Sequence, residues 1–191
     1  MPRLTLDCPE LAFQGDLAYA RAILESYEAQ DADQRDAREC MLQFLTEHPR
    51  NAHLRECIPG HLTASAILLH PDGQRGLFTH HKKLERWLQL GGHCDGDANL
   101  AAVALREAYE ESGIEGLWIE PTPIDLDIHM IPARKQDPGH LHLDTRFLVH
   151  APEGAEYVVS DESHDLAWLT LEELEACADG SVLRIARQCM G

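Results

Sequence analysis

The sequence predicts an α+β fold, an α/β/α sandwich in which a mixed central sheet lies between helices, with a helical N-terminal extension. Its 191 residues suit one domain, because domains usually contain about 100–200 residues. Residues 17–48 have helical periodicity, whereas short apolar runs with period two surround a single strong helix after Gly60. We therefore divide the chain into an extension at 1–55 and a domain at 56–191.

The extension is predicted to contain two helices. The first has an apolar stripe at i, i+3 and i+4 spacing, formed by Leu17, Ala20, Ile23, Leu24 and Tyr27. The stripe of the second is formed by Cys40, Met41, Phe44 and Leu45. A break is expected in the polar stretch 30–36, where Asp31 or Asp33 can cap the second helix. We expect the extension to pack on the domain; an interaction arm, a cover over the cleft or a homodimer surface are the alternatives.

The domain is predicted to alternate between strands and helices. Strands are expected at 62–70, 76–80, 87–92, 118–131, 141–151 and 167–169, and helices at 99–112, 171–178 and 182–188. Gly113 stands where the first of these helices should end. Thr170 and Glu173 form a capping-box pattern at the start of the second.

Charge and composition exclude several classes of partner. Lys and Arg number 16 against 33 Asp and Glu, a formal charge of −17 that repels nucleic-acid backbones and anionic membranes. No apolar run approaches the roughly 18–20 residues of a membrane span, and the first residues do not resemble a signal peptide. The six cysteines form no C-x-x-C pair and are expected to be reduced thiols in a cytoplasmic protein. An anionic ligand would need a local reversal of this charge, for which a divalent metal is the usual device.

Three carboxylates share one face of the predicted helix 99–112. Glu107, Glu110 and Glu111 are spaced i, i+3 and i+4, and this clustering is a local electrostatic cost. Hard oxygen donors at this spacing suit Mg²⁺ or Mn²⁺, with substrate phosphates completing the coordination shell. A solvated acidic face is the alternative in so acidic a chain.

The segment from Gly92 to Ile114 resembles the Nudix box, G-x5-E-x7-R-E-U-x-E-E-x-G-U, where U is aliphatic. The positions that match are Gly92, Arg106, Glu107, Ala108, Glu110, Glu111, Gly113 and Ile114. Ala98 departs from the box, which has Glu at that position. The resemblance extends over most of residues 60–174 and leaves out the first 50 residues.

The resemblance implies a metal-dependent hydrolase of a nucleoside diphosphate linked to another moiety X, a small-molecule substrate, with Mg²⁺ or Mn²⁺ as cofactor. Glu107 and Glu111 would be the main metal ligands and Glu110 the third carboxylate. Arg106 would hold these carboxylates through charge-assisted hydrogen bonds. Gly92 and the loop after it would let the backbone approach the metal and the diphosphate. Metal-activated water would then cleave the pyrophosphate bond.

Ala98 leaves two alternatives to hydrolysis open. Asp95 or Asp97 can replace the missing Glu in part, as helix caps or through water. Otherwise the chain binds metal weakly, or is a non-catalytic nucleotide-binding module. An isomerase that resembles isopentenyl-diphosphate isomerase is the other alternative, since Cys94 and 12 histidines suit its histidine-rich metal site and catalytic Cys. The intact tail of the box favours hydrolysis.

Further candidates lie outside the acidic helix face. Residues 140–147 alternate, so one strand face carries His140, His142, Asp144 and Arg146. We expect this face in the substrate cleft, with His142 and Arg146 on phosphates or Asp144 near the metal; a solvated face is the alternative. His93, after the double glycine, is expected to contact phosphate or metal, or else to be a structural loop residue. Weaker candidates are the basic cluster 80–83 and, as general bases, Glu162 and His164.

Overall fold

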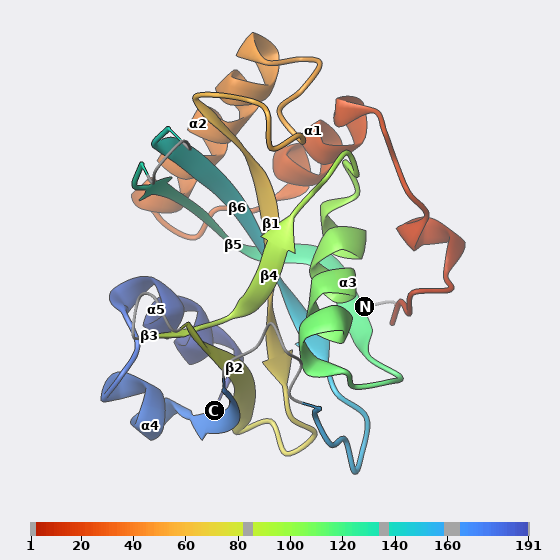
Figure 1. Cartoon of the computed structure of the whole chain (residues 1–191), viewed down its shortest axis with the longest axis vertical. Helices are drawn as coiled ribbons and strands as arrows, with labels where there is room; N and C mark the ends of the chain where they lie inside the picture. The colour runs from red at the N-terminus through yellow and green to blue at the C-terminus, as the bar shows by residue number, and fades with distance from the viewer. Residues whose placement is uncertain (1–2, 82–85, 134–137, 159–164, 191) are drawn as a thin grey trace.

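The computed structural model describes residues 3–81, 86–133, 138–158 and 165–190. In this part of the chain the helices lie on both sides of a seven-stranded mixed sheet (Figure 1). The strands are β1 (Gly60–Leu69), β2 (Arg75–His81), β3 (Arg86–Leu88), β4 (Leu90–His93), β5 (Trp118–Ile131), β6 (His140–His150) and β7 (Leu166–Thr170). The helices are the 3₁₀ turn η1 (Pro9–Leu11), α1 (Leu17–Ser26), α2 (Ala32–Glu47), α3 (Leu100–Ser112), α4 (Leu171–Glu175) and α5 (Gly180–Cys189).

The sheet is organised around β1, which pairs with three other strands. The main path runs β3-β2-β1-β6-β5, while β4 pairs with β1 and β7 with β2. β1 is parallel to β6 and antiparallel to β2 and β4. The β1–β6 register sets His61 beside His142 and Thr63 beside Asp144. Residues about 80 positions apart in the chain therefore become neighbours at the centre of the sheet.

The side chains of β1 alternate between two hydrophobic cores. Leu62, Ala64, Ala66 and Leu68 belong to the core that contains α1, α2 and α3. Ile67 and Leu69 face the other core, which is formed with α4 and α5. In Figure 1, α3 lies to the right of the sheet and α4 and α5 to its lower left. The predicted α/β/α sandwich is confirmed, because a strand buried on both faces needs a helical layer on each side.

The two N-terminal helices join the larger core at the edge strand β5. The break between them falls at 27–31, and Asp31 caps α2 by accepting a hydrogen bond from the Gln34 backbone at 2.8 Å. The buried Gln34 side chain then bonds both backbone groups of Leu126 in β5, accepting at 3.0 Å and donating at 3.2 Å. The Tyr27 hydroxyl donates to the same Gln34 oxygen at 2.9 Å. The Gln34 side-chain amide thus pairs the backbone groups that the edge strand β5 would otherwise leave without a partner at Leu126.

The structure confirms the helix predicted at 99–112, whereas it differs from the prediction at the strand 87–92 and at the end of the helix 171–178. Asn99 caps α3, and Gly113 ends it with a left-handed φ of 66°. The strand predicted at 87–92 is two strands, because β3 pairs with β2 while β4 pairs with β1. The helix predicted at 171–178 begins with the expected capping box but ends at Glu175.

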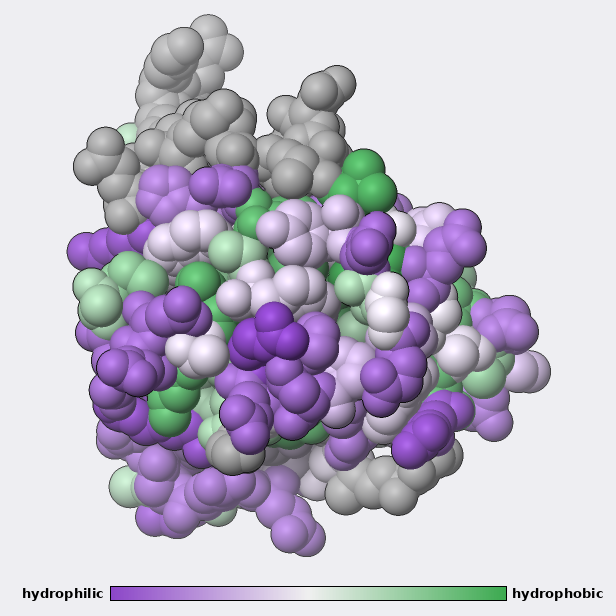
Figure 2. Space-filling view, turned by 90° about the horizontal axis from the view of Figure 1, so that it is seen from below, coloured by the Kyte–Doolittle hydropathy of each residue, from purple (hydrophilic) through white to green (hydrophobic). Residues whose placement is uncertain are grey.

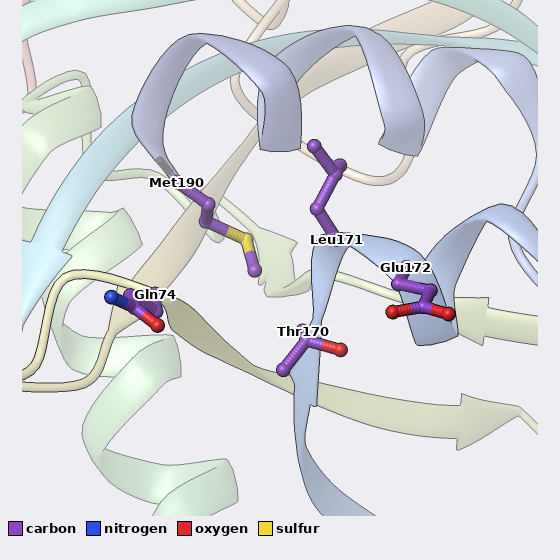
Figure 3. Close-up of a pocket in the computed structure, with 5 residues that line it drawn as sticks. All are labelled: Gln74, Thr170, Leu171, Glu172 and Met190. Carbon is purple, nitrogen blue, oxygen red and sulfur yellow. The ribbon is translucent and has the colours of Figure 1, made fainter.

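The lower end of the molecule offers a small pocket away from the acidic helix. Seen from below, the coloured surface is mostly hydrophilic, with hydrophobic residues in scattered patches (Figure 2). A shallow hollow lies beside the β1–β2 turn (Figure 3), and the described residues that line it are Gln74, Thr170, Leu171, Glu172 and Met190. This lining contains no cationic side chain to attract a diphosphate. None of the described helices is long and apolar enough to cross a membrane.

Candidate active site

Glu107 of α3 lies directly against the backbone of Gly92 in β4. A Cβ atom on Gly92 would stand 2.6 Å from the carboxylate carbon of Glu107, so this approach requires glycine. The Glu107 side chain is only 18% exposed, and its burial raises the carboxyl pKa although the neighbouring Arg106 charge opposes the shift. A cation would stabilise the ionised form of this half-buried carboxylate.

Arg106 connects the acidic helix to the loop that follows β4. Its Nη2 atom lies 3.5 Å from Glu107 Oε1 and donates to the His93 carbonyl oxygen at 3.4 Å. Its Nη1 atom lies 3.6 Å from Asp97 Oδ2. One guanidinium therefore holds the metal-ligand candidate and both ends of the loop in a fixed relation.

The other two carboxylates differ in exposure. Glu111 is half-buried, whereas Glu110 is exposed, although its charge is near enough to raise the pKa of Glu107. Within the described residues, the three carboxylates do not converge as a ready-made set of three ligands. This arrangement still fits Mg²⁺, which is usually held by one or two carboxylates with water and substrate phosphates. Glu107 and Glu111 are the two less exposed carboxylates of the three.

The N-terminal segment covers the position at which the box departs from its consensus. Ala98 is fully buried, and its N–H donates to the Gln14 carbonyl at 2.6 Å. The Gln14 N–H donates in turn to Asp97 Oδ1 at 3.1 Å, and Asn99 donates to the Glu10 carbonyl at 2.9 Å. Backbone of the extension therefore packs where the box would carry a Glu side chain.

Of the two predicted substitutes for that Glu, only Asp97 contacts Arg106. Asp97 is 4% exposed and serves as an anchor for Arg106, Gln14 and the Asn99 backbone. Asp95, in contrast, forms a bidentate ion pair with Arg55 at 2.6 and 2.7 Å. This pair lies at the surface of the loop between β4 and α3.

Asp144 and Arg146 are buried in an ion-pair network, so the alternative of a solvated face is wrong for these two residues. Asp144 accepts hydrogen bonds from Ser65 at 2.7 Å and from Arg146 at 2.9 Å. Arg146 is 2% exposed and also bonds Asp125 at 3.0 Å and the Ser181 hydroxyl at 2.7 Å. The network gives both residues a structural role in joining β1, β5, β6 and α5. A direct contact of either one with substrate stays a prediction.

His93 and His142 lie in a group of histidines beside this network. Their ring centroids are 5.0 Å apart, and each lies about as close to the ring of His61. Burial lowers the pKa of His93 to about 4 and that of His142 to about 3, so both rings are neutral at pH 7. The sequence analysis missed His61, although the polar alternation of His61, Thr63 and Ser65 along β1 was a usable signal.

The remaining candidates contribute less. The ring of His80 is tilted against that of Trp87, with ring centroids 5.1 Å apart, while Lys82 and Lys83 lie outside the described residues. Glu162 and His164, the general-base candidates, also lie outside them. Cys94 is 1% exposed, and burial raises the pKa of its thiol far above neutrality. The isomerase alternative therefore loses its reactive thiolate.

The comparisons with known proteins identify the family of the chain. The NUDIX domain family matches residues 59–187, well over half of the chain. The chain therefore belongs to the Nudix family, and membership implies hydrolysis of a pyrophosphate bond in a nucleoside diphosphate derivative. No protein with a curated description matches the sequence.

The solved structure of an Ap4A hydrolase shares the fold, and two NUDIX hydrolase structures are also similar to this chain. A C. elegans Ap4A hydrolase in a binary complex is 19% identical with a TM-score of 0.54, over 66% of this chain and 93% of that chain. A NUDIX family hydrolase from Clostridium perfringens is 21% identical with a TM-score of 0.48, over 68% of this chain and 95% of that chain. A MutT NUDIX hydrolase from Burkholderia pseudomallei is 23% identical with a TM-score of 0.46, over 68% and 97%.

Proposed function

We propose that the chain hydrolyses the pyrophosphate bond of a nucleoside diphosphate linked to a second moiety X, with Mg²⁺ or Mn²⁺ held by Glu107 and Glu111. The observation that carries this proposal is the packing of the Glu107 carboxylate against Gly92, with Arg106 beside it. When bound, the metal would neutralise the diphosphate and activate a water molecule.

The residues of the chain itself position the reacting groups. Glu107 and Glu111 would hold the cation, and Glu110 would add negative charge at the exposed side of the same helix face. Arg106 fixes the Glu107 carboxylate relative to the His93 carbonyl. His93 and His142 are proposed contacts to the substrate because their rings adjoin that loop. Asp144 and Arg146 are proposed to support substrate binding from beneath, by fixing β6 against β1.

The substrate panel should include several classes of X. One similar structure is that of an Ap4A hydrolase, so dinucleoside polyphosphates are included with nucleoside diphosphate sugars and nucleoside triphosphates. A charge of −17 favours a small-molecule substrate over nucleic acid. A cytoplasmic location and a homodimer complete the proposal.

Each substrate should be assayed with Mg²⁺ and with Mn²⁺, and the best one should be repeated with variants. We expect Glu111→Gln to lower kcat/KM by at least about 100-fold, which is about 2.7 kcal/mol of transition-state stabilisation. Glu115→Gln, at an exposed acidic residue just after the box, should hydrolyse at the wild-type rate. Equal rates for Glu111→Gln and wild type would refute the assignment. Ligands that raise Tm without any turnover would instead favour the binding-module alternative.

A further inference from the structure

Five histidines gather on the sheet face opposite α3. They come from four neighbouring strands: His61 from β1, His93 from β4, His129 from β5, and His140 and His142 from β6. The ring centroid of His61 lies 5.0 Å from that of His93 and 4.9 Å from those of His140 and His142. The ring of His129 lies 5.4 Å from that of His142. The function proposed above uses His93 and His142 as substrate contacts but gives no role to His61, His129 or His140.

Three of these rings direct a nitrogen toward a common point. One ligand atom from each of His61, His140 and His142 lies within 4.8 Å of the other two. A tetrahedral ion with metal–nitrogen distances of about 2.0–2.1 Å places its nitrogen ligands roughly 3.4 Å apart. The three atoms therefore need to approach one another by little more than 1 Å, which small rotations of the rings can supply.

The hydrogen bonds of these rings leave nitrogen lone pairs available. His140 Nδ1 lies 3.0 Å from the Pro138 carbonyl oxygen, to which only a protonated nitrogen can donate, so Nε2 carries the lone pair. His142 Nε2 is buried without a hydrogen-bond partner among the described residues. The His61 side chain is buried, since the residue is only 3% exposed. Neither of its ring nitrogens makes a hydrogen bond of normal geometry with a described residue, although the backbone of Cys57 lies near the ring. Buried polar atoms of this kind usually have a partner.

The surroundings of the cluster carry an excess of negative charge. The ion-pair network beside it contains the carboxylates of Asp125, Asp127 and Asp144 but only the two guanidiniums of Arg146 and Arg184. Asp127 reaches the cluster directly, since its Oδ2 lies 2.8 Å from His129 Nδ1. On the other side, the charge of Arg55 is already paired with Asp95. A cation among the rings would offset this imbalance.

We propose that His61, His140 and His142 form a transition-metal site for which Zn²⁺ is the favoured ion. Imidazole nitrogens suit Zn²⁺, whereas the glutamate oxygens of α3 suit Mg²⁺ or Mn²⁺, so the two sites differ in their preferred metal. Three protein ligands leave the fourth tetrahedral position open to water or to an oxygen of an anionic ligand. The site is distinct from the Nudix carboxylates and does not depend on the hydrolysis proposed above.

Metal binding by the purified full-length chain tests this site directly. After removal of metals with a chelator, Zn²⁺ is titrated in competition with a chromophoric chelator, and Co²⁺ is followed by its visible absorption. We expect one equivalent of Zn²⁺ and a tetrahedral Co²⁺ spectrum. Loss of an outer hydrogen-bond partner typically weakens metal sites by roughly 10–100-fold, so the double variant His140→Gln/His142→Gln, which loses two ligands, should bind Zn²⁺ more weakly still.

Matched variants separate this site from other ligands. His80→Gln removes a histidine outside the cluster, and Glu107→Gln removes the Nudix carboxylate; both should keep the Zn²⁺ affinity and the Co²⁺ spectrum. If circular dichroism shows that the double variant is unfolded, His140→Cys replaces it and should bind Co²⁺ with an added sulfur-to-metal absorption band. Equal Zn²⁺ binding by wild type and the double variant would place the metal elsewhere on the chain and overturn the proposal. No binding by wild type, loss of binding in Glu107→Gln, or an unchanged Co²⁺ spectrum in His140→Cys would overturn it as well.

Discussion

Gly92→Ala should reduce hydrolysis strongly while leaving the fold nearly intact. The new methyl carbon would stand 2.6 Å from Glu107 Cδ, whereas carbon atoms in contact are about 3.5–4.0 Å apart. The carboxylate must therefore move by about 1 Å, and a displacement of that size can lower a catalytic rate by about 100-fold. This corresponds to about 2.7 kcal/mol in the activation barrier. The free energy of unfolding should fall by only about 1–2 kcal/mol, because the clashing group is the end of a flexible side chain.

The assay compares kcat/KM for the best substrate of the panel with the midpoint of urea unfolding. Gly180→Ala is the matched control, since no atom lies within 4 Å of the added methyl group, and it should be fully active. The double variant Gly92→Ala/Glu107→Gln should be no slower than Glu107→Gln alone, because both changes act through one carboxylate. Wild-type activity in Gly92→Ala, or fully additive losses in the double variant, would refute the reasoning.

Three further predictions concern stability. Arg146→Ala should lower the free energy of unfolding by about 3–5 kcal/mol in urea titrations, because it leaves the buried Asp144 carboxylate without its guanidinium partner; a loss under 1 kcal/mol would contradict the network. Although burial acts in the opposite direction, the hydrogen bond with His129 and the charge of Arg146 hold the pKa of Asp127 below its usual value. The stabilising effect of ionised Asp127 is therefore present above the unfolded pKa of about 3.9 and is lost as the pH falls through the folded pKa. Acid titrations of wild type and Asp127→Asn should show that the free energy of unfolding depends less on pH in the variant. Gln34→Ala should cost about 1–3 kcal/mol, because it unpairs both backbone groups of Leu126, and it should leave kcat/KM unchanged.

The acidic helix could be predicted from sequence because its signals are local. The Asn99 cap, the apolar stripe and Gly113 all act within one turn of the positions that they determine. The packing of Glu107 against Gly92 was not predicted, because it depends on how β4 approaches α3. The family resemblance implied only that the backbone at Gly92 approaches the metal and the diphosphate. The sequence also did not indicate that residues 87–92 form two strands. This division depends on which strands they pair with, β2 for β3 and β1 for β4.

The histidine cluster and the buried network were beyond sequence analysis. Their members meet only through the parallel register of β1 and β6 and the antiparallel register of β5 and β6. Alternation along residues 140–147 correctly grouped His140, His142, Asp144 and Arg146 on one face. It gave no sign that Asp125 and Arg184 would cover part of that face, since burial by a distant helix leaves no trace in a local pattern.

The hydrogen bonds from residues 10–14 to the start of α3 have a consequence for how the enzyme can be divided. Residues 59–187 carry the family signature, yet a truncation to those limits would uncover Ala98 and remove the acceptors of its N–H and of the Asn99 amide. The first turn of α3, the helix that bears Glu107 and Glu111, would then be exposed to solvent instead of packing against residues 10–14. In this chain, a unit that keeps the start of α3 covered therefore has to include residues from about Glu10 onward.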